Sequence, residues 1–149
     1  MKKPASFRRT EMYGTILLSL DISPTDRPII DHIKQLAGIM HSRVILLRVA
    51  TGAAAQFHGK NAAGEEIAEI RAYLDKVKAE FEAANIPVSV ELGYGEPGRE
   101  IIKFVNEKGC DLLAMGTHGH KLVGDLVHGT TASRVQHNVS IPVLLLRAR

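Results

Sequence analysis

The sequence predicts one α/β domain in which a parallel β-sheet carries helices on both faces. The chain has 149 residues, which is the length of one ordinary domain. Short apolar runs alternate along it with longer amphipathic stretches, in the order βαβαβαβαβ. Strands that are apolar throughout are buried on both faces, as in a parallel sheet between two helix layers. The expected architecture is therefore a single doubly wound domain.

The first strand and helix are predicted on either side of a short turn. Residues 15–20 (TILLSL) form an apolar run typical of a buried strand, and Asp21 follows it. Ser23 suits the N-cap of a helix, Pro24 its first position, and Asp26 the positive end of the helix dipole. The helix then has one apolar face, made of Ile29, Ile30, Ile33, Leu36, Ala37 and Met40.

The second strand is predicted over residues 43–49 (RVILLRV), which are β-branched and nearly all apolar. Residues 50–64 contain small residues and glycines, so we expect a loop there. Apolar residues then recur at spacings of three and four, as in an amphipathic helix: Ile67, Ile70, Leu74, Val77, Phe81 and Ala84.

The remaining elements complete the alternation. Residues 87–92 (PVSVEL) alternate in polarity, which suits a strand near a sheet edge. A turn over residues 93–98 precedes a helix, and residues 111–115 (DLLAM) are the fourth strand. After a long glycine-bearing loop we expect a helix near residues 131–138 and a fifth strand over residues 142–146 (PVLLL). The helix before the fourth strand has an apolar face that comprises Ile101, Ile102 and Val105.

Composition excludes several classes of protein. The chain is 45% hydrophobic and 23% charged, which are globular averages and exclude a disordered or fibrous chain. The net charge is +3, but six of the 19 basic residues lie at the two ends, so a basic nucleic-acid-binding face is not predicted. We expect residues 1–12 to be a basic tail without fixed structure before a domain over residues 13–149. A single cysteine, Cys110, and the lack of a secretory signal favour a cytoplasmic location.

One segment is glycine-rich and follows the fourth strand. Gly116 and Gly119 are separated by Thr117 and His118, and nine residues later come Gly129, Thr130 and Thr131. Glycines let backbone N–H groups approach a ligand closely, and a helix that opens at Gly129 would add unpaired donors. From the spacing alone, a phosphate cradle and an ordinary loop with turn glycines are about equally favoured.

The same segment offers a metal site as an alternative. His118, His120 and His128 lie near Asp125, and imidazoles on a loop are possible ligands. Nothing in the spacing fixes a third ligand, so polar residues that flank a polyphosphate are the favoured interpretation, and no metal ligands are assigned.

The glycine spacing resembles the nucleotide-binding signature of the universal stress protein family, which is glycine, two residues, glycine, nine residues, glycine, then serine or threonine. The segments LLSLDIS, VILLRV, GEPGREI, CDLLAMGTHG and SIPVLLLR also resemble the family's strands and loops. The resemblance covers residues 13–147. It implies a five-stranded parallel sheet of order 3-2-1-4-5, in which the ends of the first and fourth strands form a ligand crevice.

The resemblance also implies the ligand, because members that retain the glycines bind ATP or related adenine nucleotides. By position, Asp21 and Val49 would frame the adenosine, largely through backbone groups. The ribose and phosphates would lie against a second set of residues, namely Met115, Gly116, Gly119, Gly129 and Thr130. Thr117 and His118 would be near neighbours of the ligand, and Thr131 is also assigned to the binding site. ATP or AMP is the expected ligand, with Mg²⁺ or Mn²⁺ bridging the phosphates.

We expect a binding protein that acts as a nucleotide-dependent sensor or switch in a stress response, and no catalytic residues are assigned. Two alternatives stay open: a slow ATP hydrolase with His118 as its base, and a partner-binding domain whose nucleotide site is vestigial.

The last strand, with Pro142 and Arg147 at its ends, is apolar on both alternations. It would lie at a sheet edge, so we expect a homodimer through it, as the resemblance also implies.

Overall fold

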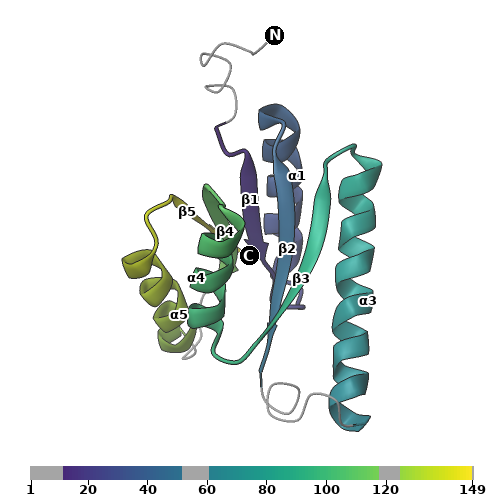
Figure 1. Cartoon of the computed structure of the whole chain (residues 1–149), viewed down its shortest axis with the longest axis vertical. Helices are drawn as coiled ribbons and strands as arrows, with labels where there is room; N and C mark the ends of the chain where they lie inside the picture. Colours follow the sequence, from purple (N-terminus) through teal and green to yellow (C-terminus); the bar gives the residue numbers. More distant parts are fainter. Residues whose placement is uncertain (1–11, 52–60, 118–124, 149) are drawn as a thin grey trace.

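The computed structural model describes residues 12–51, 61–117 and 125–148, with the side chains of residues 61–63 and 125–130 left out. Within these residues five strands alternate with four helices, as the sequence predicts (Figure 1). Their bounds are β1 Thr15–Ser19, α1 Asp26–Met40, β2 Arg43–Ala50, α3 Asn61–Ala83, β3 Val88–Tyr94, α4 Pro97–Lys108, β4 Leu112–Thr117, α5 Asp125–Asn138 and β5 Val143–Arg147.

The strands form one parallel sheet of order β3-β2-β1-β4-β5, which confirms the predicted order. In the register of the central strands, Leu17 of β1 lies between Ile45 of β2 and Leu113 of β4. The chain first moves outward through β2 and β3, then crosses back to pair β4 with β1. The predicted edge strand β3 does lie at one edge, and β5 lies at the other.

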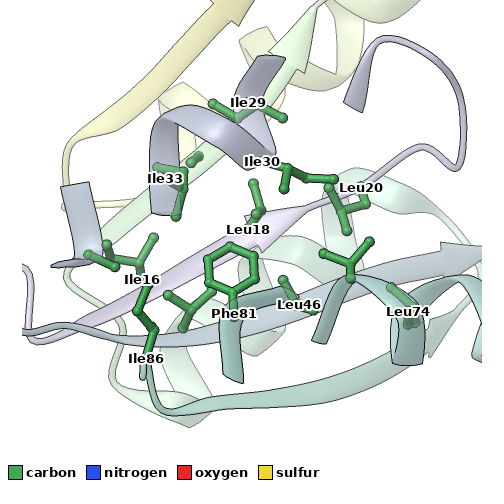
Figure 2. Packing of buried hydrophobic residues seen from close by; sticks show 14 of the residues in the cluster. Ile16, Leu18, Leu20, Ile29, Ile30, Ile33, Leu46, Leu74, Phe81 and Ile86 are labelled. Atoms are coloured by element: carbon green, nitrogen blue, oxygen red, sulfur yellow. The ribbon is translucent and has the colours of Figure 1, made fainter. Parts of the chain in front are cut away.

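Both faces of the sheet are buried, as the unbroken apolar runs predict. On one face, Ile16 and Leu18 of β1 pack with α1 and α3, and Phe81 of α3 is fully buried among them (Figure 2). On the other face, Leu17 packs with residues of α4 and α5 such as Val135. Since successive strand residues point to opposite faces, each strand contributes to both cores.

The starts of all four helices differ from the prediction. Helix α1 begins at Asp26, because residues 23–25 form a turn in which Ser23 Oγ accepts from the Thr25 N–H at 3.3 Å. Helix α3 begins at Asn61, so residues 61–64 are helical rather than loop. Gly64 is tolerated inside this helix because a glycine there costs only about 1 kcal/mol relative to alanine, which is offset by the apolar face farther along.

Helix α5 is the third difference, and it concerns the predicted cradle. The helix begins at Asp125, so Gly129 and Thr130 lie in its second turn instead of opening it. The prediction that the helix N-terminus lies at Gly129 is therefore wrong. Glycine is a poor helix former, and its presence suggested a boundary, but local propensity is weak enough for the helix to continue through it.

Helix α4 begins at Pro97, so Pro97 and Gly98 are helical rather than part of the predicted turn. Glu96 is the N-cap, and its carboxylate accepts from the backbone N–H groups of Gly98 at 3.1 Å and Arg99 at 2.7 Å. Pro97 occupies the first helical position, where no N–H is needed. Gly109 ends the helix in the left-handed conformation, with φ of 63°.

Candidate functional site

A cleft with about 200 Å³ of free space opens at the carboxyl ends of the central strands. Its floor comes from the ends of β1, β2 and β4, and one wall comes from Pro97 and Ile101 of α4 with Thr131 and Ala132 of α5. Strands β1 and β4 are neighbours whose connections lead to opposite sides of the sheet. In doubly wound domains ligands bind at this switch point.

The structure brings several of the predicted site residues together. Asp21 and Val49 line the cleft from the ends of β1 and β2, and a second group lines it from β4 and α5, namely Met115, Gly116, Thr117 and Thr131. These groups are separated by more than 60 residues in the sequence. The side chain of Val49 is buried in the core, although the residue also lines the cleft.

The other predicted site residues cannot be placed in the same way. His118 and Gly119 lie outside the described residues, as do His120 and the rest of the loop up to residue 124. Gly129 and Thr130 are described only as backbone of α5. Their roles stay predictions.

Gly116 has a second neighbour besides the cleft. A Cβ at this position would lie 3.1 Å from the backbone oxygen of Thr25 and 3.5 Å from Cγ2 of Ile29. That first distance is tighter than a side chain normally tolerates, so the glycine lets the start of α1 approach β4 closely. Packing within the protein therefore already favours a glycine at this position, whether or not a ligand approaches it.

Arg48 lines the cleft and was missed by the sequence analysis. Its guanidinium Nη1 lies 3.9 Å from Oδ1 of Asp21, and its buried Nε has no hydrogen-bond partner among the described residues. The pair places a cation and a carboxylate at one side of the cleft. The sequence did offer a signal for Arg48, because it is a charged residue inside a strand that is mostly apolar. Such a side chain must extend to solvent at the end of the strand or pair with an opposite charge.

Glu96 connects the two helices, α4 and α5, that form the wall of the cleft. Besides capping α4, its carboxylate lies 3.2 Å from Nη1 of Arg134 on α5. The pKa of Glu96 is lowered from its ordinary value, mainly by the hydrogen bond from the Arg99 N–H. This ion pair links the two helices that carry Pro97 and Thr131 into the cleft.

The part of the chain that the structure describes shows neither a cluster of metal-binding side chains nor a reactive cysteine. No three histidine, cysteine or acidic residues there are grouped to hold a metal ion. Burial, with a smaller contribution from Asp111, raises the pKa of Cys110 to about 11, so its thiol is unreactive at neutral pH. A search of the same residues finds no helix long and apolar enough to span a lipid bilayer.

Comparison with known proteins identifies the family to which the chain belongs. The model of the universal stress protein family matches residues 12–147. The chain belongs to the universal stress protein family. Its five-stranded parallel sheet of order β3-β2-β1-β4-β5 is the fold of this family.

Two curated relatives show how far the sequence likeness extends. The chain is 25% identical to the universal stress protein MJ0577 of Methanocaldococcus jannaschii, over 93% of this chain and 97% of that protein. It is 39% identical to the universal stress protein Slr1230 of a Synechocystis strain over 67 residues, which span 45% of this chain but only 23% of that protein.

Solved structures resemble this universal stress protein over nearly its whole length. The structure of MJ0577 has a TM-score of 0.80 at 25% identity and covers 93% of this chain and 98% of that one. A universal stress protein in complex with cAMP has a TM-score of 0.69 at 19% identity, with 91% and 97% covered. One from Archaeoglobus fulgidus in complex with dAMP has a TM-score of 0.68 at 18% identity, with 90% and 98% covered.

Proposed function

We propose that this universal stress protein binds ATP or AMP in the cleft at the ends of β1, β2 and β4 and acts as a nucleotide-dependent sensor or switch in a stress response. The observation that carries the proposal is the convergence of Asp21 and the segment from Met115 to Thr117 on one cleft at the switch point. Complexes of structurally similar family members with cAMP and dAMP support an adenine nucleotide as the ligand.

The cleft residues suit separate parts of such a ligand. Asp21 and the Val49 backbone lie at the side formed by β1 and β2, where we place the adenosine. Met115, Gly116 and Thr117 lie at the end of β4, where we place the ribose and phosphates, together with Gly119, Gly129, Thr130 and Thr131 of the glycine segment and with His118. A divalent ion, Mg²⁺ or Mn²⁺, would bridge the phosphates and needs few protein ligands.

Three further features belong to the same proposal. The protein is a homodimer through β5, it acts in the cytoplasm, and residues 1–12 are a basic tail outside the domain. Binding rather than hydrolysis is the proposed activity, because phosphoryl transfer needs a positioned base and charge-neutralising groups beyond a binding cradle.

The test is a calorimetric titration of the full chain with ATP, AMP and cAMP, with and without Mg²⁺. We expect saturable binding of ATP or AMP, and loss of it in Gly129→Val, whose side chain would occupy the space proposed for phosphate. The matched control is Gly38→Val, at the far end of α1, where an added Cβ meets nothing within 4 Å. The cradle assignment is wrong if Gly129→Val binds as the parent does, and a parent that binds none of the nucleotides points to a vestigial site.

A further inference from the structure

The loop between β1 and α1 is held in an unfavourable backbone conformation beside the cleft. Ile22, directly after Asp21, has φ of 61°. A β-branched side chain rarely adopts this left-handed conformation, because its Cβ substituents crowd the backbone. Such a conformation persists only where surrounding contacts impose it.

The contacts that impose it come from one buried carboxylate. Asp26 is 2% exposed, and its oxygens accept from the backbone N–H groups of Asp21 at 2.9 Å, Ile22 at 2.8 Å and Ser23 at 3.4 Å. The carboxylate therefore binds the three residues that precede the helix turn, instead of capping α1 from within. Hydrogen bonds to an ionised acceptor are among the strongest in proteins.

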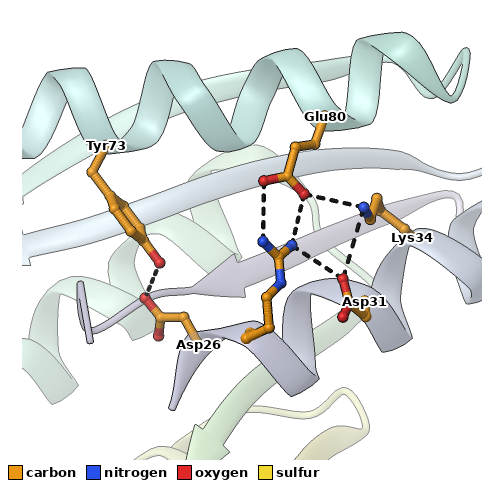
Figure 3. Close-up of polar contacts among 6 residues, drawn as sticks. Asp26, Asp31, Lys34, Tyr73 and Glu80 are labelled. Carbon is orange, nitrogen blue, oxygen red and sulfur yellow. Dashed lines mark hydrogen bonds and ion pairs between the residues drawn. The ribbon is translucent and has the colours of Figure 1, made fainter. Parts of the chain in front are cut away.

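The same carboxylate is anchored from a second element. The Tyr73 hydroxyl, on α3, donates to Oδ2 of Asp26 at 2.7 Å (Figure 3). Burial, together with this hydrogen bond, raises the pKa of Tyr73, so the hydroxyl stays a donor at all physiological pH values. The position of the loop thus depends on the packing of α3 against α1.

We propose that Asp26 is a positioning residue of the nucleotide cleft, which holds the 21–23 backbone so that Asp21 faces the ligand, with Tyr73 fixing the carboxylate from α3. This rests on the proposed nucleotide site, since Asp21 is the one of residues 21–23 that lines the cleft. Asp26 itself acts only through the loop.

Asp26→Asn is the main test. One carboxylate oxygen becomes an NH₂ group, which then faces a backbone N–H of the loop as a second donor. We expect the affinity for ATP or AMP to fall about tenfold or more, and the amides of residues 21–23 to exchange hydrogen about tenfold faster or more while those of β1 do not change. Tyr73→Phe removes one of four donors and should weaken binding about threefold. Asp31→Asn, an exposed substitution of the same type on α1, should change neither quantity.

A second substitution separates positioning from general destabilisation. Glycine adopts the left-handed conformation without steric cost, so Ile22→Gly should restore much of the affinity that Asp26→Asn loses. The positioning role is overturned if Ile22→Gly does not restore the nucleotide affinity of Asp26→Asn and if that lost affinity parallels the lower stability of the variant in urea. Parent-like affinity and exchange in Asp26→Asn overturn it too.

The proposed function and this inference can fail separately. If the parent binds no nucleotide, the proposed function fails, and amide exchange alone decides the inference. Faster exchange confined to residues 21–23 in Asp26→Asn supports it, whereas unchanged exchange overturns it. If Asp26→Asn does not fold, Tyr73→Phe carries the same two measurements, and we expect a smaller increase in the exchange rate, again confined to residues 21–23.

Discussion

Gly116 shows at the scale of one residue how a position singled out for ligand binding also serves packing. It lines the cleft, yet the nearest atom to an added Cβ is the Thr25 backbone oxygen at 3.1 Å, not an atom across the cleft. The start of α1 approaches β4 through this contact, and Ile29 of α1 packs beside it. A side chain at Gly116 would therefore move the helix that carries Asp26.

Gly116→Ala is predicted to lower the free energy of unfolding by about 1–3 kcal/mol, the usual effect of overpacking a close contact. Urea unfolding at pH 7 measures it. Gly38→Ala is the matched control, since an added Cβ there meets nothing within 4 Å and should raise stability by about 0.5–1 kcal/mol. Equal stability of the two variants would contradict the packing role of Gly116.

At the scale of elements, α1 and α3 are joined across their exposed sides by ion pairs. Arg27 donates to both oxygens of Glu80, at 3.2 and 2.6 Å, and Lys34 donates to Glu80 at 3.1 Å (Figure 3). Asp31 lies 3.1 Å from Arg27. The hydrogen bond from Arg27, with a further one from Lys34, lowers the pKa of Glu80 from its ordinary 4.5 to about 2. The two pairs made by Glu80 fix α3, and so Tyr73, against α1, whereas Asp31 pairs with Arg27 within α1 itself.

Glu80→Gln is predicted to lower the free energy of unfolding by about 1 kcal/mol at pH 7, the upper end for a partly exposed ion pair. Because the folded-state pKa of Glu80 is lowered, its contribution is present above pH 4.5 and is lost as the pH falls toward about 2. Urea unfolding of parent and variant between pH 7 and pH 2 should show the difference shrinking in that window. Glu82→Gln, whose pair with Lys78 is 3.9 Å long, should differ little from the parent at any pH. A difference that is constant with pH would refute this assignment.

The whole molecule has two sheet edges that differ in chemistry. The β3 edge carries Ser89 and Glu91, and Glu91 pairs with Lys108 at 3.1 Å. At the β5 edge, Leu145 is 38% exposed, as is Tyr94 of β3, but Leu145 lies between two further leucines in the middle of its strand. Among the described residues β5 pairs only with β4, so its outer backbone groups face away from the sheet. An apolar edge strand is a template for pairing with a second strand, and a twofold axis would satisfy both copies.

We therefore predict a homodimer, seen by sedimentation at micromolar concentration as a species of twice the 16.3 kDa chain mass. Leu145→Asp should shift the protein toward monomer, because it would bring two carboxylates together in an apolar interface. Ile39→Asp is the control, since Ile39 is an apolar residue that is 73% exposed and belongs to α1 rather than to β5. A parent that sediments as a single 16.3 kDa species contradicts the prediction.

The sequence by itself determined the fold class and the five strand segments, because apolar periodicity is a local record of which faces are buried. The strand order came from the family resemblance, and with it the meeting of Asp21 and Gly116. Only the tertiary structure decided what individual polar residues do. Asp26 was predicted to favour a helix dipole, but it binds the preceding loop and a tyrosine 47 residues away. Arg48 similarly reaches Asp21 from a neighbouring strand. Hydrogen bonds and ion pairs of this kind depend on which distant segments meet, and a pattern along the chain carries no record of that.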